Sequence, residues 1–475
     1  MKAPKFNNIK WFLEDNGLIP LLGSLPLNEE VKRGYFTCDY KDKGIFIKSF
    51  KEKGSVGFIR NRVSPRGKKE YNAGKRLLAL SIMTPKPLGY GISDRGSYII
   101  QERIEGNTFV NIFFESKDRA GLIMKLADLL RTLKTKMVVH NDLHLNNVIV
   151  HNENLYLIDL HKMQIKGRIT LKDEVSSLSH AITMLYDTMS TDEKTLFFSR
   201  YGEQGIRTYV EKEMGRLWER WIRKKQKRAF ENTSKIVVDG DCIYTAGTEV
   251  LVGSDPVQLI KKDKKIIVER HSDHIRKYYR NRRRLQLAWK NHVALKYLEL
   301  SITPEPYCVK HPSLFSWGYI AMEDLTGSGI EFDRYLDKTY DRMDTEVKTA
   351  LIEEFSRFLA LLFKKKIAHR DLKGCNIFVL NEGRFLLLDV EDILFTIIDE
   401  ERLKRMLVQL NTTIPVRISI YDRMRLYLKV IKGINVDKKQ VFNDVKNRSL
   451  KSEIVYEGVS GLQRESFMVI PIRLQ

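Results

Sequence analysis

The sequence predicts an α+β chain of two similar tandem domains, each with a small β-rich lobe and a larger helical lobe. The pattern H-x-D-x-x-x-x-N occurs twice, and the two copies are 229 positions apart. In each copy an apolar run follows and ends on an aspartate, 12 or 13 residues after the asparagine. Two such copies at matched spacing are improbable by chance, so we interpret the chain as a repeat of one domain. The residues are His140, Asp142, Asn147 and Asp159 in the first copy and His369, Asp371, Asn376 and Asp389 in the second.

These residue types in this order are typical of phosphoryl transfer from ATP. One carboxylate accepts or orients the proton of the attacking hydroxyl, and an amide and a second carboxylate hold the Mg²⁺ that neutralises the triphosphate. The expected bases are Asp142 and Asp371. The expected Mg²⁺ ligands are Asn147, Asp159, Asn376 and Asp389. The fold expected from these motifs is a tandem of two protein-kinase-like bilobal domains.

The first copy also carries candidates for phosphate positioning. The run GIFIKSF alternates as a strand does and places Lys48 near its end, and a helix over residues 66–81 has Glu70 in its first turns. A strand lysine paired with a helix glutamate contacts the α- and β-phosphates in kinases. A surface lysine and a glutamate favoured by the helix dipole are the alternatives. Residues 101–104 are the expected adenine hinge, and phosphate cover is expected from residues 32–35, because no G-x-G-x-x-G is present.

The second copy departs from the first in this region. The strand before its basic helix, expected over residues 272–301, reads KIIVERH and offers Glu269 where a lysine is required. Counting from the shared TPKP and TPEP segments places Ala288–Trp289 opposite Glu70. The second copy is therefore expected to be an active site that uses another cation, Arg270 or Lys261, or a weak or inactive regulatory copy. If only one copy works, we expect it to be the first.

Composition limits the partners and the location. The net charge of +22 favours an acidic partner, such as a membrane surface or a phosphorylated substrate, and no nucleic-acid recognition motif accompanies it. No apolar run approaches the roughly 18 residues of a membrane span, and no secretory signal is evident. The four scattered cysteines suit a cytoplasmic protein. The basic run 208–230, with Trp218 and Trp221, is either an interfacial helix or a solvated linker.

The expected organisation has four parts. They are a lead-in over residues 1–30, a first kinase-like domain over 31–207, a basic helical linker over 208–231 and a second kinase-like domain over 232–475.

One segment adds a resemblance to a known family. LIDLHKMQIKGRI, which follows HNDLHLNNVIV, is similar to the bacterial lipopolysaccharide core heptose kinases, and LAWKNHVALKYLELSITPEP resembles the related Kdo/InaA-type kinases. The resemblance implies ATP- and Mg²⁺-dependent transfer of the γ-phosphoryl group to a sugar hydroxyl of the inner core, heptose or Kdo. It also implies a cytoplasmic protein at the inner face of the inner membrane, with an anionic glycolipid as partner. Lys48 and Glu70 would position phosphates in this family.

Two alternatives remain open at this stage. A protein serine/threonine kinase, or another small-molecule kinase, shares the same motifs, although no A-P-E segment follows Asp389. In the other alternative the second copy is a pseudokinase that binds a partner or regulates the first.

Overall fold

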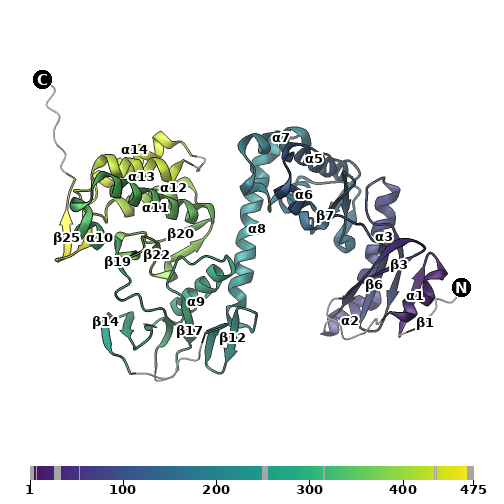
Figure 1. Cartoon of the computed structure of the whole chain (residues 1–475), viewed down its shortest axis with the longest axis horizontal. Coiled ribbons are helices and arrows are strands. Elements are labelled where there is room, and N and C mark those ends of the chain that lie inside the picture. The colour runs from purple at the N-terminus through teal and green to yellow at the C-terminus, as the bar shows by residue number, and fades with distance from the viewer. Residues whose placement is uncertain are drawn as a thin grey trace. The chain divides into compact units, whose positions relative to one another are not determined.

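The computed structural model forms two compact units, Met1–Leu217 and Trp218–Gln475. It describes residues 5–6, 8–25, 34–52, 54–248, 255–313, 316–432, 434 and 436–467. Each unit has its own sheet and its own helical core, so each is described by itself (Figure 1).

The first unit contains a six-stranded sheet in the order β1-β2-β5-β6-β4-β3, in which every neighbouring pair is antiparallel. Successive side chains of a strand point to opposite faces, so the burial of Ile45 and Ile47 in the core places Lys48 on the other face. The strands are β1 (Lys5–Phe6), β2 (Ile9–Leu13), β3 (Tyr35–Tyr40), β4 (Lys43–Lys51), β5 (Pro87–Ile92) and β6 (Gly96–Glu102).

The described part of residues 1–30, expected as a lead-in, contributes to this sheet. Strand β2 pairs with β5, and the side chain of Trp11 on β2 is fully buried. Helix α1 (Ile19–Ser24) buries Leu22 in the same small core.

Helix α3 (Arg66–Ala79) lies on the sheet, as Figure 1 shows beside β6. A Cβ atom at Gly67 would lie 2.2 Å from the carbonyl oxygen of Tyr98, so only glycine permits this approach. The Gly67 amide donates to Ser97 Oγ at 3.0 Å. This close contact fixes the first turns of the helix, where Glu70 lies.

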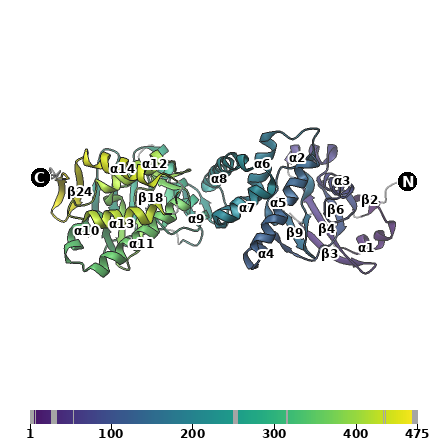
Figure 2. The ribbon, with the colours of Figure 1, turned by 90° about the horizontal axis from the view of Figure 1, so that it is seen from above.

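The larger lobe of the first unit is helical, and its helices gather away from the sheet in Figure 2. Its helices, with the short α2 of the small lobe, are α2 (Gly54–Val63), α4 (Phe109–Glu115), α5 (Arg119–Thr135), α6 (Leu171–Ile182), α7 (Thr191–Tyr201) and α8 (Arg207–Lys227). Its short strands are β7 (Asn107–Thr108), β8 (Val138–His140), β9 (Val148–His151), β10 (Asn154–Leu157) and β11 (Met163–Ile165).

The second unit contains a seven-stranded antiparallel sheet in the order β12-β13-β17-β18-β16-β15-β14. Five of its strands, β13-β17-β18-β16-β15, repeat the order β2-β5-β6-β4-β3 of the first unit. Strand β16 is thus the counterpart of β4, and β15 is the counterpart of β3. The strands are β12 (Ile236–Asp239), β13 (Cys242–Thr245), β14 (Gln258–Lys262), β15 (Ile266–Arg270), β16 (Ile275–Tyr279), β17 (Pro306–Lys310) and β18 (Gly318–Met322).

The remaining elements of the second unit are mostly helical. The long helix expected over residues 272–301 is wrong, because β16 occupies its first part and α9 begins only after the Asn281 cap. The helices are α9 (Arg282–Tyr297), α10 (Phe332–Thr339), α11 (Thr345–Lys364), α12 (Glu400–Asn411), α13 (Ile420–Ile431) and α14 (Lys438–Leu450). The short strands are β19 (Gly329–Glu331), β20 (Ile367–His369), β21 (Ile377–Leu380), β22 (Phe385–Leu387), β23 (Ile393–Phe395), β24 (Ile454–Gly458) and β25 (Gly461–Glu465).

The basic run of the sequence lies on α8. In its second half the Lys225 ammonium lies 5.1 Å from the ring centre of Trp221 and 4.4 Å from that of Tyr297. Gln226 donates to Asn291 at 2.9 Å. Part of the tryptophan and lysine pattern therefore serves packing within the second unit. Among the described helices, none is long and apolar enough to cross a bilayer.

Candidate active sites

In the first unit, Lys48 joins the sheet to the motif residues. Its Nζ lies 2.6 Å from Asp159 Oδ1 and 3.2 Å from Glu70 Oε2. Burial raises the pKa of Glu70 above its ordinary value, and the charge of Lys48 opposes that rise. Burial acts in the same direction on Asp159, but His161 and Lys48 lower its pKa well below the usual range. The structure therefore brings these three predicted residues together.

Glu70, Asp159 and His161 also offer ligand atoms within 4.8 Å of one another. His161 Nδ1 lies 2.7 Å from Asp159 Oδ1, which is the same oxygen that Lys48 contacts. A cation is already present in this cluster as the lysine ammonium. We therefore interpret it as a charge pair that orients Lys48, and not as a separate metal centre.

The motif HNDLHLNN forms the turn between β8 and β9. The Asp142 amide donates to His140 Nδ1 at 3.3 Å, and Asn147 Nδ2 donates to the Asp142 carbonyl at 3.2 Å. Because the Asn147 amide nitrogen is used by the backbone, the amide oxygen is left for a cation. Burial lowers the pKa of His140 to about 4, which keeps the imidazole neutral near pH 7.

The two carboxylates of the motif have different environments. Asp159 adopts the left-handed conformation, with φ of 59°, so the chain turns sharply at the end of the β9–β10 hairpin. Asp142 forms an ion pair with Lys162. Burial tends to raise the pKa of Asp142, but the hydrogen bond and charge of Lys162 lower it below its ordinary value. Asp142 is thus held as a carboxylate, the form required of a base.

Lys48, Glu70, Asn147 and Asp159 line a cavity of about 620 Å³. The hinge segment 101–104 forms one wall, and Ile149 and Ile158 form apolar surface beside Asn147 and Asp159. An oxygen-rich set of one amide and one carboxylate suits Mg²⁺, and the apolar surface suits a purine ring. Of the expected phosphate cover, Tyr35 lines the cavity, and residues 32 and 33 lie outside the described residues.

In the second unit, the lysine is Lys277. The expectation that Glu269 occupies the lysine position is wrong, because Glu269 lies on β15 and the counterpart of β4 is β16. Lys277 Nζ lies 2.6 Å from Asp389 Oδ1, and its strand pairs it with Ile320, as Lys48 pairs with Ile99. Neither Arg270 nor Lys261 is needed as a substitute. Arg270 forms an ion pair with Asp324 at 2.7 Å.

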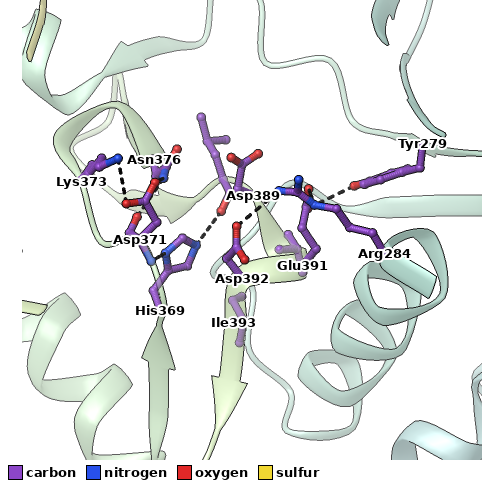
Figure 3. A network of polar contacts seen from close by, with 12 residues as sticks. Tyr279, Arg284, His369, Asp371, Lys373, Asn376, Asp389, Glu391, Asp392 and Ile393 are labelled. Atoms are coloured by element: carbon purple, nitrogen blue, oxygen red, sulfur yellow. Dashed lines mark hydrogen bonds and ion pairs between the residues drawn. The ribbon is translucent and has the colours of Figure 1, made fainter. Parts of the chain in front are cut away.

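The carboxylate partner of Lys277 comes from a different element than in the first unit. Glu391, two residues after Asp389, places Oε1 3.1 Å from Lys277 Nζ and 3.1 Å from Arg284 Nε. Figure 3 shows Arg284 extending from α9 toward Glu391, and the Tyr279 hydroxyl donates to the same carboxylate at 3.1 Å. Helix α9 thus supplies a cation where α3 supplies Glu70.

The loop of the second motif repeats the geometry of the first (Figure 3). The Asp371 amide donates to His369 Nδ1 at 3.3 Å, and Asn376 Nδ2 donates to the Asp371 carbonyl at 2.8 Å. Lys373 Nζ lies 2.9 Å from Asp371 Oδ1. Asp389 is again left-handed, with φ of 47°. The structure therefore brings all three motif residues and a lysine together in this unit too.

Sequence reasoning missed several of these residues for a common reason. In the first unit α2 separates the lysine strand from the helix, whereas in the second unit α9 begins three residues after β16 ends. The helix expected from residue 272 includes β16, so counting back from that expected helix selects β15, the wrong strand. The alternating run IRKYY before the Asn281 cap was the available signal. The missed residues are His161, Lys162, Lys277, Arg284, Lys373 and Glu391.

Comparison with known proteins finds a family match and similar solved structures. The model of the "Lipopolysaccharide kinase (Kdo/WaaP) family" matches residues 31–195. No curated protein matches the sequence. One similar solved structure is WaaP in complex with acyl carrier protein, with 18% identity, 47% of this chain covered, 100% of that chain covered and a TM-score of 0.33.

Two others are structures of WbdD, of which this chain spans about half. The bifunctional kinase-methyltransferase WbdD has 15% identity, covering 45% of this chain and 54% of that chain, with a TM-score of 0.28. The structure of WbdD with a kinase inhibitor has 14% identity and a TM-score of 0.28. The match covers 43% of this chain and 48% of that chain. The family resemblance seen in IDLHKMQ is confirmed by the match of residues 31–195 to the lipopolysaccharide kinase (Kdo/WaaP) family model, and the protein is a kinase.

Proposed function

We propose that the protein is an ATP- and Mg²⁺-dependent phosphotransferase that phosphorylates a sugar hydroxyl, of heptose or Kdo, in the inner core of lipopolysaccharide. The observation that carries this proposal is the assembly of Lys48, Glu70, Asn147 and Asp159 around one cavity, within the segment that matches the family. The Asp142 carbonyl accepts a hydrogen bond from Asn147, which joins the proposed base to this group. The first unit is the proposed enzyme of this reaction, and the second unit is proposed to be a second kinase-like domain in tandem.

The proposed roles follow from the charges of these side chains and their contacts. Lys48, held between Glu70 and Asp159, positions the α- and β-phosphates. The Asn147 and Asp159 oxygens hold Mg²⁺, which neutralises charge on the triphosphate. Asp142, kept ionised by Lys162, takes the proton of the acceptor hydroxyl. The hydroxyl oxygen forms a bond to the γ-phosphorus, the bond to the bridging oxygen breaks, and ADP leaves with that electron pair.

The net charge of +22 supports an anionic glycolipid at a membrane surface as the acceptor. We accordingly place the protein in the cytoplasm, in peripheral contact with the inner face of the inner membrane. Arg223 and Lys224 on α8, both exposed, are candidates for this contact. Nucleic acid is not a proposed partner.

The test is transfer of labelled phosphate from ATP to purified lipopolysaccharide core, before and after enzymatic dephosphorylation of the core. Asp142→Asn removes the base and is expected to lower the rate by about 10²-fold or more. Asp128→Asn, on α5 and paired with Arg200, is the matched control and keeps the rate. Transfer by the parent to a protein acceptor, with none to core, would contradict the glycolipid proposal and favour the protein-kinase alternative.

A further inference from the structure

The second unit holds a full set of phosphotransfer groups, outside the segment that the family model matches. We propose that it is a second, independent phosphotransfer site, which binds its own nucleoside triphosphate with a divalent cation and uses Asp371 as the base toward an alcohol acceptor. This inference goes beyond the proposed function of the first unit, because it does not depend on which acceptor the first unit uses.

The backbone around the second motif matches that around the first, contact by contact. The amide before each aspartate of the proposed cation site donates to the carbonyl of the motif asparagine, from Ile158 to Asn147 at 2.9 Å and from Leu388 to Asn376 at 2.9 Å. The amide of each base donates to the motif histidine, at 3.3 Å in both units. In both units the asparagine nitrogen is used by the backbone, which leaves the amide oxygen for a cation.

The buried charges of the second unit are arranged for a ligand and not only for packing. Glu391 is 1% exposed, and it is compensated by Lys277 and Arg284. Burying such charges costs solvation free energy, and well-packed apolar residues would fill the same space without that cost. Lys277 also lies 2.6 Å from Asp389 Oδ1, so its ammonium has two carboxylate partners.

Lys277 faces an open cavity of about 410 Å³. Phe378 and Leu388 line it two residues after Asn376 and one before Asp389, as Ile149 and Ile158 do in the first unit. These two side chains provide apolar surface for a purine ring, while Lys277 and Asp389 lie where phosphates and a cation would be held. The cavity therefore suits a nucleoside triphosphate.

The lysine beside the base has also moved between the units. In the first unit Lys162, three residues after Asp159, pairs with Asp142. In the second unit position 392 is an aspartate that contacts Arg284, and Lys373 from the motif loop pairs with Asp371 instead. Both bases thus retain a lysine, supplied from different segments. The second unit likewise keeps a buried carboxylate beside its strand lysine, supplied by Glu391 and not by the helix.

The proposed step is the same displacement in both sites. The acceptor hydroxyl oxygen bonds to the γ-phosphorus, the bond from the γ-phosphorus to the bridging oxygen breaks, and ADP leaves with the electron pair. The proton of the hydroxyl passes to the Asp371 carboxylate. In the absence of a sugar acceptor, water can take the place of the hydroxyl, and ADP and inorganic phosphate are released.

The first experiment measures how many nucleotides the full chain binds. Equilibrium dialysis with a non-hydrolysable ATP analogue and Mg²⁺ is expected to give two equivalents for the parent. Lys48→Met with Asp159→Asn is expected to leave one equivalent, and so is Lys277→Met with Asp389→Asn. The matched control is Glu269→Gln, on the neighbouring strand β15, which is expected to keep two equivalents.

Folding of each variant is checked by its unfolding curve, and Glu391→Gln is the milder variant if Lys277→Met with Asp389→Asn does not fold. Glu391→Gln is expected to lower the affinity of the second site for the ATP analogue roughly tenfold. One equivalent in the parent, lost when the first site is altered, would overturn the proposal. Two equivalents in a folded protein with the second site altered would overturn it as well.

The second experiment measures ADP formation with the first site silenced by Lys48→Met and Asp159→Asn. ADP formation is expected to persist above that of a protein with both sites silenced, and Asp371→Asn is expected to lower it by about 10²-fold. ADP formation no faster than in the doubly silenced protein would overturn the transfer step. Neither readout uses lipopolysaccharide, so failure of the glycolipid proposal would leave both results interpretable.

Discussion

Glu391 in the second unit takes the place of Glu70 in the first, although the two residues lie on unrelated elements. Glu70 approaches its lysine from helix α3, at 3.2 Å, and Glu391 approaches its lysine from the segment after Asp389, at 3.1 Å. Glu391 lies two residues after Asp389, and the residue two positions after Asp159 in the first unit is His161. The same lysine environment is therefore built in two ways within one chain.

This relationship predicts that the arrangement of the second unit can be transplanted into the first. Glu70→Gln removes the buried negative charge beside Lys48 and is expected to raise the KM for ATP about tenfold, which corresponds to about 1.4 kcal/mol. Adding His161→Glu places a carboxylate near the Lys48 ammonium again. The KM for ATP of this double variant is expected to return most of the way to the parent value. Steady-state kinetics with core as acceptor measures both. His161→Glu alone is the control, and a double variant no better than Glu70→Gln would contradict this account.

The ion pair between Lys162 and Asp142 predicts a shift in the pH profile. Because Lys162 lowers the pKa of Asp142, Lys162→Met is expected to raise that pKa. The base is active only when ionised, so the acid limb of kcat/KM moves to higher pH. The profile from pH 4 to pH 8 measures the shift, and Lys166→Met, which loses an ion pair with Asp173, is the matched control. An unchanged acid limb with reduced kcat would assign Lys162 a different role.

His140 predicts a stability change with pH. Its pKa is about 4 in the folded protein, against an ordinary value of 6.5. Between these values the unfolded chain binds the proton and the folded chain does not, so stability falls as the pH drops below about 6.5. Between pH 7 and pH 5 this contribution is about 2 kcal/mol.

The measurement is denaturant unfolding of the parent and of His140→Gln at several pH values. The variant is expected to lose less stability on acidification, whatever its stability at pH 7. His151→Gln, at a half-buried position on β9, is the control. Equal slopes with pH in parent and His140→Gln would show that another group carries the dependence.

Asn147 predicts a change in the demand for divalent cation. Asn147→Leu removes the amide oxygen proposed for Mg²⁺ and the hydrogen bond to the Asp142 carbonyl. The Mg²⁺ concentration for half-maximal rate is expected to rise about tenfold, with a fall in kcat of roughly 10²-fold. Titration of the rate with Mg²⁺ measures both quantities, and Asn111→Leu on the exposed side of α4 is the control. A lower kcat at an unchanged Mg²⁺ requirement would remove Asn147 from the cation site.

Local rules are enough to predict that Lys48 and Glu70 lie near each other in the first unit. Strand alternation places Lys48, and Glu70 lies in the first turns of the helix that follows. In the second site, local patterns predict only the motif loop, because Asp371 and Asn376 have the same spacing as Asp142 and Asn147. Lys277 could not be found in this way, because the basic run over residues 272–301 predicts one long helix and so conceals β16, the strand that carries Lys277.

Residues that act across the fold could not be derived from spacing at all. Nothing local to Glu391 shows that it meets a lysine 114 residues earlier in the chain. The same holds for Lys162 and Asp142, which are joined only when β11 pairs with β8. Both contacts depend on how the loops fold back onto the sheet, and a repeat within the chain does not reveal them when the charges have been exchanged.

The two positions of the carboxylate beside the strand lysine, Glu70 and Glu391, also decide the order in which such charges can be exchanged by substitution. Removing the glutamate of one unit first leaves a buried ammonium with one partner fewer, at a cost in stability of several kcal/mol. Introducing the second carboxylate first adds a surplus negative charge, which a nearby arginine such as Arg284 can offset. Gain before loss is therefore the less costly order of exchange.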